Sequence, residues 1–95
     1  MACLLEFHPK AKKEFDKLSR ELQGQVLRKL GERLENPRVP GDALHGLADC
    51  YKIKLRRAGY RLVYQVQDRT VTILVLAIGK RDKLAVYGSA KARLK

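Results

Sequence analysis

Cysteine and histidine, the residues most often found in metal and redox sites, are scarce in this 95-residue sequence. The two cysteines, Cys3 and Cys50, lack the CxxC spacing of metal and redox motifs, and His8 and His45 do not form a ligand cluster with them. We expect both cysteines to be reduced and buried, as is usual in a cytosolic protein. The sequence therefore predicts neither a metal site nor a cofactor.

Long apolar runs, low-complexity tracts and internal repeats are also missing. No apolar segment approaches the length that spans a bilayer. The N-terminus, MACLLEFHPKAKK, has neither the early positive charge nor the small-residue cleavage site of a signal peptide. A chain of this length holds one modest core. We expect one cytoplasmic domain over residues 1–95, with no membrane association.

Acidic residues are rare in the C-terminal half of the chain. Residues 1–49 contain nine Lys or Arg and eight Asp or Glu, whereas residues 50–95 contain twelve and two, a net charge of +10. Each cation that neutralises a phosphate releases counterions and adds salt-dependent affinity. This asymmetry indicates a polyanion, such as nucleic acid, as the partner. The alternative is a basic surface that serves solubility or binds an acidic protein.

The N-terminal half has the periodicity of a strand followed by two amphipathic helices. Residues 2–7 suit an opening strand, and Pro9 suits the first turn of a helix. Ser19 is a candidate cap for a second helix that ends at Asn36-Pro37. The apolar stripe of that helix consists of Leu22, Val26, Leu27, Leu30 and Leu34. We expect the two helices to form a hairpin on one face of a sheet.

The C-terminal half reads as three strands and a weaker helix, after a loop over residues 37–49. The strands are predicted at residues 50–55, 60–67 and 71–78; the last is apolar on both sides, as a central strand is, and Gly79 should end it. Residues 82–94 form the helix, with Leu84, Tyr87, Lys91 and Leu94 at helical spacing. The order is β-α-α-β-β-β-α, an α+β fold on a mostly antiparallel sheet.

One face of the predicted hairpin YKIKLRRAGYRLVYQV, residues 51–66, is crowded with cations. Alternation along the strands places Tyr51, Ile53 and Leu55 on the core face. The opposite face receives Lys52, Lys54 and Arg56, joined by Arg61 across the turn. Opposed like charges destabilise a sheet, and local rules tend to fail where function overrides them. An ordinary solvated face is the alternative, but four cations, with Lys80-Arg81 ending the next strand, favour an anion site.

Such a site can catalyse RNA cleavage without carboxylates, histidine or metal. The ribose 2′-OH can attack the adjacent phosphate if a base removes its proton and cations stabilise the phosphorane. Crowding by other cations disfavours the charged form of a lysine and makes it a better base. Arginine presents a bidentate donor pair to phosphate oxygens. Tyr87 is a candidate for stacking on a nucleobase.

The segments LHGLADCYKIKLRRAGYRLVYQV and VTILVLAIGKRDKLAVY closely resemble the RelE toxins of bacterial and archaeal toxin–antitoxin pairs, and the likeness extends over essentially the whole chain. The strand YRLVYQV and the GKR strand end also occur across the wider RelE/ParE superfamily. Their combination with KIK, and with a tyrosine six residues after Arg81, is more specific. The resemblance implies a ribosome-dependent endoribonuclease that cuts mRNA in the A site without metal and leaves a 2′,3′-cyclic phosphate.

The resemblance also implies roles for individual residues. Lys54 is expected to be the general base, and Lys52 and Arg61 to stabilise the phosphorane. Arg81 would stabilise or protonate the leaving 5′-oxygen, and Tyr87 would stack on the nucleotide. The assignment of each proton among Lys52, Lys54 and Arg81 stays open. Further RNA- or ribosome-binding residues are expected at Arg56, Arg57, Lys80 and His45. His45 occupies a position that is often basic in close relatives and contacts ribosomal RNA, or it is an ordinary loop residue.

Partners and rival functions follow from the same resemblance. RelB-type antitoxins wrap such toxins with an acidic helical segment, and operator DNA is bound only through the antitoxin. The basic face and the weak C-terminal helix would suit an acidic chain that folds on binding; we expect it to cover this face or to displace the helix carrying Tyr87. The rivals are a ParE-like toxin that poisons gyrase, a non-catalytic RNA- or ribosome-binding module, and a nuclease that cuts free RNA.

Overall fold

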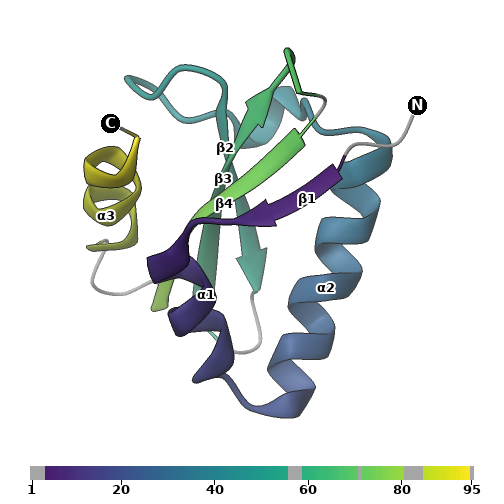
Figure 1. Cartoon of the computed structure of the whole chain (residues 1–95), viewed down its shortest axis with the longest axis vertical. Coiled ribbons are helices and arrows are strands. Elements are labelled where there is room, and N and C mark those ends of the chain that lie inside the picture. The colour runs from purple at the N-terminus through teal and green to yellow at the C-terminus, as the bar shows by residue number, and fades with distance from the viewer. Residues whose placement is uncertain (1–3, 56–58, 71, 81–84, 95) are drawn as a thin grey trace.

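The computed structural model describes residues 4–55, 59–70, 72–80 and 85–94. Its helices and strands follow the predicted α+β order (Figure 1). They are β1 (Leu4–Phe7), α1 (Pro9–Asp16), α2 (Arg20–Glu35), the 3-10 turn η1 (Pro40–Asp42), β2 (Cys50–Leu55), β3 (Tyr60–Gln67), β4 (Thr72–Lys80) and α3 (Ala85–Arg93). No helix among these residues is long and apolar enough to cross a membrane.

The four strands form one mixed sheet in the order β1-β4-β3-β2. β2, β3 and β4 form the predicted antiparallel meander, and β1 runs parallel to β4. β4 is therefore an inner strand, and Val75 and Leu76, which point to opposite faces, are both fully buried. The prediction that this strand is covered on both sides is confirmed. The prediction that Gly79 ends it was wrong, because Lys80 still pairs with Tyr60.

The ends of the helices follow the capping signals in the sequence. Pro9 opens α1, and Ser19 caps α2 by accepting a hydrogen bond from the Leu22 backbone N–H at 3.2 Å. Both features agree with prediction. The predicted apolar stripe of α2 was wrong at Leu27, which is 49% exposed. Leu27 lies about 100° around the helix from the buried Val26 and so turns away from the sheet.

The two faces of the sheet pack against different elements, and Figure 1 shows α2 and α3 on opposite sides of it. α1 and α2 cover one face, where the strands contribute Tyr51, Ile53, Leu55, Leu62, Tyr64, Val66, Ile73, Val75 and Ile78 to the core. This confirms the predicted alternation in β2 and β3. α3 and the loop around Leu44 and Leu47 cover the other face through a smaller cluster that includes Val63 and Ala77.

The residues noted for their helical spacing are not the ones that α3 buries most deeply. Val86 and Ala90 are buried, whereas Lys91 is exposed and Tyr87 is only partly buried; Leu84 lies outside the described residues. The reason is a close approach between helix and sheet. A Cβ atom added at Gly79 would lie 3.4 Å from the Cβ of Val86. Small side chains therefore face the sheet, and the larger ones lie on the flanks of the helix.

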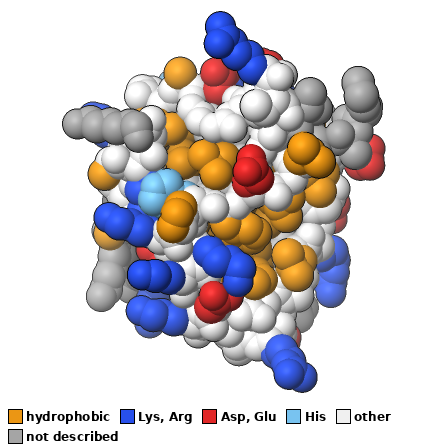
Figure 2. Space-filling view, in the orientation of Figure 1, with side chains coloured by type: hydrophobic (Ala, Val, Ile, Leu, Met, Phe, Trp, Pro, Cys, Tyr) orange, Lys and Arg blue, Asp and Glu red, His pale blue; other side chains and the backbone are white. Residues whose placement is uncertain are grey.

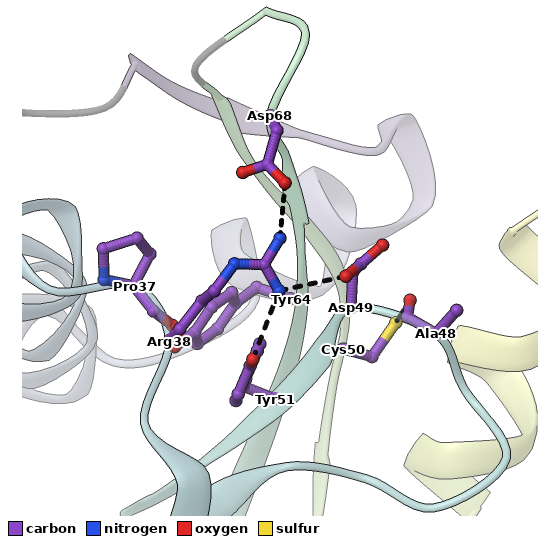
Figure 3. A network of polar contacts seen from close by, with 8 residues as sticks. All are labelled: Pro37, Arg38, Ala48, Asp49, Cys50, Tyr51, Tyr64 and Asp68. Atoms are coloured by element: carbon purple, nitrogen blue, oxygen red, sulfur yellow. Dashed lines mark hydrogen bonds and ion pairs between the residues drawn. The ribbon is translucent and has the colours of Figure 1, made fainter.

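Arg38 joins the two ends of the loop before β2 to the turn between β3 and β4 (Figure 3). Its guanidinium donates to Asp49 at 3.0 Å and to Asp68 at 2.6 Å, with a longer contact of 3.4 Å to the Tyr51 hydroxyl. Asp49 has φ 60°, a left-handed conformation that is uncommon outside glycine. The Arg38 side chain is 40% exposed, so each of its ion pairs contributes about 0–1 kcal/mol.

Cys50 is free and buried, as predicted, and Cys3 lies outside the described residues. The Cys50 thiol donates to the carbonyl oxygen of Ala48 at 3.4 Å (Figure 3). Burial, together with the nearby charge of Asp49, raises the pKa of the Cys50 thiol to about 11. This cysteine is a packing residue beneath α3.

Candidate functional site

The register of the sheet aligns cations from neighbouring strands on one face. Lys54 on β2 lies opposite Arg61 on β3, and Arg61 lies opposite Gly79 on β4. Lys52 lies opposite Val63, which belongs to the cluster beneath α3. Residues directly opposed across strands share a face. Lys52, Lys54 and Arg61 therefore share the α3 face, as predicted.

Tyr87 on α3 lies against Arg61. The Nη1 of Arg61 donates to the Tyr87 hydroxyl at 2.6 Å, and the guanidinium carbon lies 5.9 Å from the centroid of the tyrosine ring. The Nε of Arg61 is buried and has no hydrogen-bond partner among the described residues. A buried donor left without an acceptor costs roughly 1–3 kcal/mol. The contact thus joins the C-terminal helix to the cations.

Among the described residues, no carboxylate forms an ion pair with the cations of this face. The ion pairs within the described part of the chain involve Lys12, Arg33, Arg38 and Arg93, and none includes Lys52, Lys54 or Arg61. Lys54 is exposed, while Lys52 and Arg61 are half-buried. We call Lys52, Lys54, Arg61 and Tyr87 the cationic site. In Figure 2, several Lys and Arg side chains lie at the lower left of the view, around α1 and below α3 as Figure 1 places them.

The other predicted residues have different positions. Lys80 pairs with Tyr60, which packs against the core under α1 and α2, so Lys80 leaves the sheet from the face opposite the cationic site. His45 is exposed in the loop between Leu44 and Leu47, which pack beneath α3; it therefore lies on the same face as the site. Arg56, Arg57 and Arg81 lie outside the described residues.

A separate cleft of about 770 Å³ runs between α2 and the open edge of β2. Both signs of charge line it, including Glu21, Arg28, Lys29 and Glu32. Lys54 at its rim is the one residue that it shares with the cationic site. Mixed charge makes this cleft a poorer match for a polyanion than the α3 face. In the described residues, no group of three or more His, Cys, Asp or Glu side chains is arranged to hold a metal ion.

Arg33 is a supporting residue that the sequence did not identify. Its Nη1 donates to the backbone carbonyl of Lys52 at 3.3 Å and to the Tyr64 hydroxyl at 2.9 Å, and its Nη2 donates to Asp42 at 2.6 Å. Burial lowers the pKa of Arg33, but Tyr64 and Asp42 outweigh burial and raise it overall. Arg33 thus fixes the outer edge of β2 at Lys52. The sequence carries no signal for this, because Arg33 looks like a solvent-facing helical arginine.

The class of protein is defined by a match to the model of a known protein family. A family model described as the ParE toxin of the type II toxin-antitoxin system, parDE, matches residues 5–85. This range includes α1, α2, β2, β3, β4 and all of β1 except its first residue. The chain therefore has the fold of a type II toxin.

Individual relatives narrow the family. The chain is 48% identical to the mRNA interferase toxin RelE of Escherichia coli strain K12 over 94 residues, which cover 99% of each chain. An arginine-to-alanine double mutant of E. coli toxin RelE in the free state matches with a TM-score of 0.93 at 46% identity, over 100% of both chains. A chain of the intact E. coli RelBE toxin-antitoxin complex matches with a TM-score of 0.81 at 49% identity, over 83% of this chain and 96% of that one. The protein belongs to the RelE family of type II toxins.

Proposed function

We propose that this protein is a ribosome-dependent endoribonuclease that cuts mRNA in the A site and thereby stops translation. The observation that carries the proposal is the row of Lys54 and Arg61 across two strands, with Tyr87 against Arg61. It combines cations that make no ion pair among the described residues with an aromatic ring, the groups that bind phosphate and bases. The name of the E. coli relative, mRNA interferase toxin RelE, supports mRNA as the substrate.

In the proposed reaction, Lys54 takes the proton from the 2′-OH. The O2′–P bond forms as the P–O5′ bond breaks, which leaves a 2′,3′-cyclic phosphate and a 5′-hydroxyl. Lys52 and Arg61 stabilise the charge of the phosphorane. Arg81 stabilises or protonates the leaving oxygen, and Lys52 and Arg81 are the other candidates for the two proton transfers. Side chains alone supply this chemistry.

Arg61 and Tyr87 can bind substrate together. Nη1 of Arg61 donates to the Tyr87 hydroxyl, while Nε has no hydrogen-bond partner among the described residues. A phosphate oxygen can accept from the remaining guanidinium donors of Arg61. The Tyr87 ring, held in place by its contact with Arg61, can stack on a base. Arg56, Arg57, Lys80 and His45 are proposed as additional contacts to RNA or the ribosome.

The partner that we propose is a RelB-like antitoxin in the cytoplasm, and operator DNA would be bound only through this complex. The similarity to a chain of the E. coli RelBE toxin-antitoxin complex supports a partner of this kind. We expect the antitoxin to cover the cationic site or to displace α3, which buries only Val86 and Ala90. Amide exchange of the toxin with and without E. coli RelB tests this idea. A footprint that leaves both the site and α3 untouched would refute it.

Cleavage assays with matched variants test the activity. Purified protein is incubated with ribosomes that carry mRNA and an empty A site, and in parallel with free mRNA and with gyrase. We expect ribosome-dependent cuts with cyclic-phosphate ends, lost in Lys54→Ala or Arg81→Ala and retained in Lys29→Ala, which removes an exposed lysine from α2. Cutting of free mRNA would instead indicate a ribosome-independent nuclease. Inhibited supercoiling with intact mRNA would indicate a ParE-like toxin, and binding without cleavage a non-catalytic module.

A further inference from the structure

The edge of β4 is capped by two side chains where its partner strand ends. β1 pairs with β4 only as far as Val75. Beyond that point, the Ile78 backbone N–H donates to the Oε1 of Glu14 at 3.0 Å, and Nη1 of Arg93 donates to the Leu76 carbonyl at 2.8 Å. Glu14 comes from α1 and Arg93 from the last turn of α3. Together they replace the backbone contacts that another strand would make.

Glu14 and Arg93 also bind each other in a bidentate pair. The two bonds measure 2.8 Å from Nη1 to Oε1 and 3.0 Å from Nη2 to Oε2. The Arg93 side chain is 12% exposed and that of Glu14 is 32% exposed. Burial raises the pKa of Glu14, but the bonds from Arg93 and Ile78 and the charges of Arg93 and Lys17 outweigh burial and lower it. We call this pair the Glu14–Arg93 clamp.

The clamp adds to a modest apolar contact between α3 and the sheet. The helix has nine residues, AVYGSAKAR, with a glycine and a serine in the middle. Helices shorter than about 12 residues are marginal on their own, and an interior glycine costs about 1 kcal/mol relative to alanine. Val86 and Ala90 are buried, and Tyr87 and Leu94 pack, partly buried, against the same cluster. Apolar burial therefore provides a weak restraint on the rotation of α3 about its axis.

Tyr87 and Arg93 lie on opposite flanks of the buried line of α3. They are six residues apart, which places them about 120° apart around the helix, with Val86 and Ala90 between them. Arg93 reaches toward α1 on one flank, and Tyr87 reaches Arg61 on the other. The clamp thus fixes the rotation of the helix that sets where the Tyr87 ring lies.

We propose that Glu14 and Arg93 are positioning residues for the cationic site: they hold α3 so that Tyr87 stays at Arg61. They act through Tyr87 and do not touch substrate. Their role in cleavage rests on the proposed function. Their role in placing Tyr87 does not, and can be measured without any activity. The competing interpretation is that the clamp only covers the open edge of β4.

The first test reads the position of Tyr87 directly. In protein with 13C-labelled tyrosine, the Tyr87 resonance is assigned by its loss in Tyr87→Phe. Glu14→Gln should shift this resonance and speed amide exchange in α3 by roughly tenfold or more, with exchange in β3 unchanged. Asp16→Asn is the control, since it removes a carboxylate of α1 that, among the described residues, binds only the exposed Lys12. An unshifted Tyr87 resonance, or equal acceleration in β3 and α3, would overturn the proposal.

The second test uses single-turnover cleavage on programmed ribosomes. Glu14→Gln should lower the rate at saturating ribosome in the wild-type background and have no further effect in Tyr87→Ala, because both changes remove the same contact. Independent, additive losses would contradict a role through Tyr87. If Glu14→Gln fails to fold, Arg93→Lys takes its place in the test. It keeps the charge but loses the bidentate contact, so the cleavage rate should fall by a smaller factor. If wild type cuts no mRNA, the proposed function fails, and the Tyr87 resonance still decides the clamp.

Discussion

Gly79 gives a direct way to move Tyr87 without touching it. Gly79 lies opposite Arg61 and beneath Val86, where an added Cβ would be 3.4 Å from the Cβ and 3.7 Å from a methyl carbon of that valine. Alanine at this position makes an ordinary contact. Valine extends a further bond of about 1.5 Å beyond Cβ, into the space that Val86 occupies, so α3 must move away from β4.

The expected losses of stability and of cleavage rate in Gly79→Val can be estimated separately. Overpacking of this kind costs about 1–3 kcal/mol, which lowers Tm by roughly 4–8 °C for each kcal/mol in a domain of this size. The bond from Arg61 to Tyr87 is 2.6 Å long, and a displacement of roughly 1 Å takes it beyond the usual range of a hydrogen bond. Misplacement on that scale can reduce a rate about 100-fold.

Thermal unfolding and cleavage on programmed ribosomes check this prediction. Gly79→Val should lose stability and most of its cleavage rate. Gly79→Ala should match or exceed wild-type stability, since alanine restricts the unfolded chain by about 0.4–1 kcal/mol, and should cut normally. Wild-type cleavage by Gly79→Val, or an equal loss in both variants, would refute the reasoning that helix position controls the site.

Three further predictions concern stability and reactivity. The lowered pKa of Glu14 stabilises the fold at pH values above its ordinary pKa of 4.5, and this contribution disappears as the pH falls through the pKa of the folded state. In urea unfolding, the free energy of unfolding should therefore fall more between pH 7 and pH 4 in wild type than in Glu14→Gln. Equal falls in the two proteins would exclude this contribution. Cys50 in a Cys3→Ser variant should react slowly with a thiol reagent at pH 8 until the protein unfolds, because burial raises the pKa of its thiol to about 11; fast labelling of the native protein would contradict this. Tyr64→Phe should lower the free energy of unfolding by roughly 1–3 kcal/mol, because it removes the hydroxyl that accepts a hydrogen bond from Arg33. An unchanged midpoint in chemical denaturation would count against this role of the Arg33–Tyr64 bond.

Local patterns were enough to predict most of the fold. Alternation in β2 and β3 assigned Lys52 and Lys54 to one face and Ile53 to the other, since a period of two depends only on strand geometry. The cap at Ser19 was equally readable, because it needs one side chain and a backbone N–H three residues away. These features are local in sequence, so they need no knowledge of the tertiary structure.

The supporting contacts of the site could not be predicted, because they join distant parts of the chain. The partners Glu14 and Arg93 are 79 residues apart, and both look like ordinary charges on exposed helix faces. The close approach at Gly79, which favours Val86 and Ala90 at the sheet, could not be read from the sequence either. Lys80 was grouped with the other cations from its position at a strand end, but the register sends its side chain to the opposite face.

Lys54→Ala on programmed ribosomes tests the central claim most directly. Lys54 is exposed and lies opposite Arg61, so its removal relieves like-charge repulsion of about 0.2–1 kcal/mol. We predict that the variant is at least as stable as wild type and leaves the A-site codon intact, while wild type cuts it to a 2′,3′-cyclic phosphate. Near-normal cleavage by folded Lys54→Ala would contradict the account.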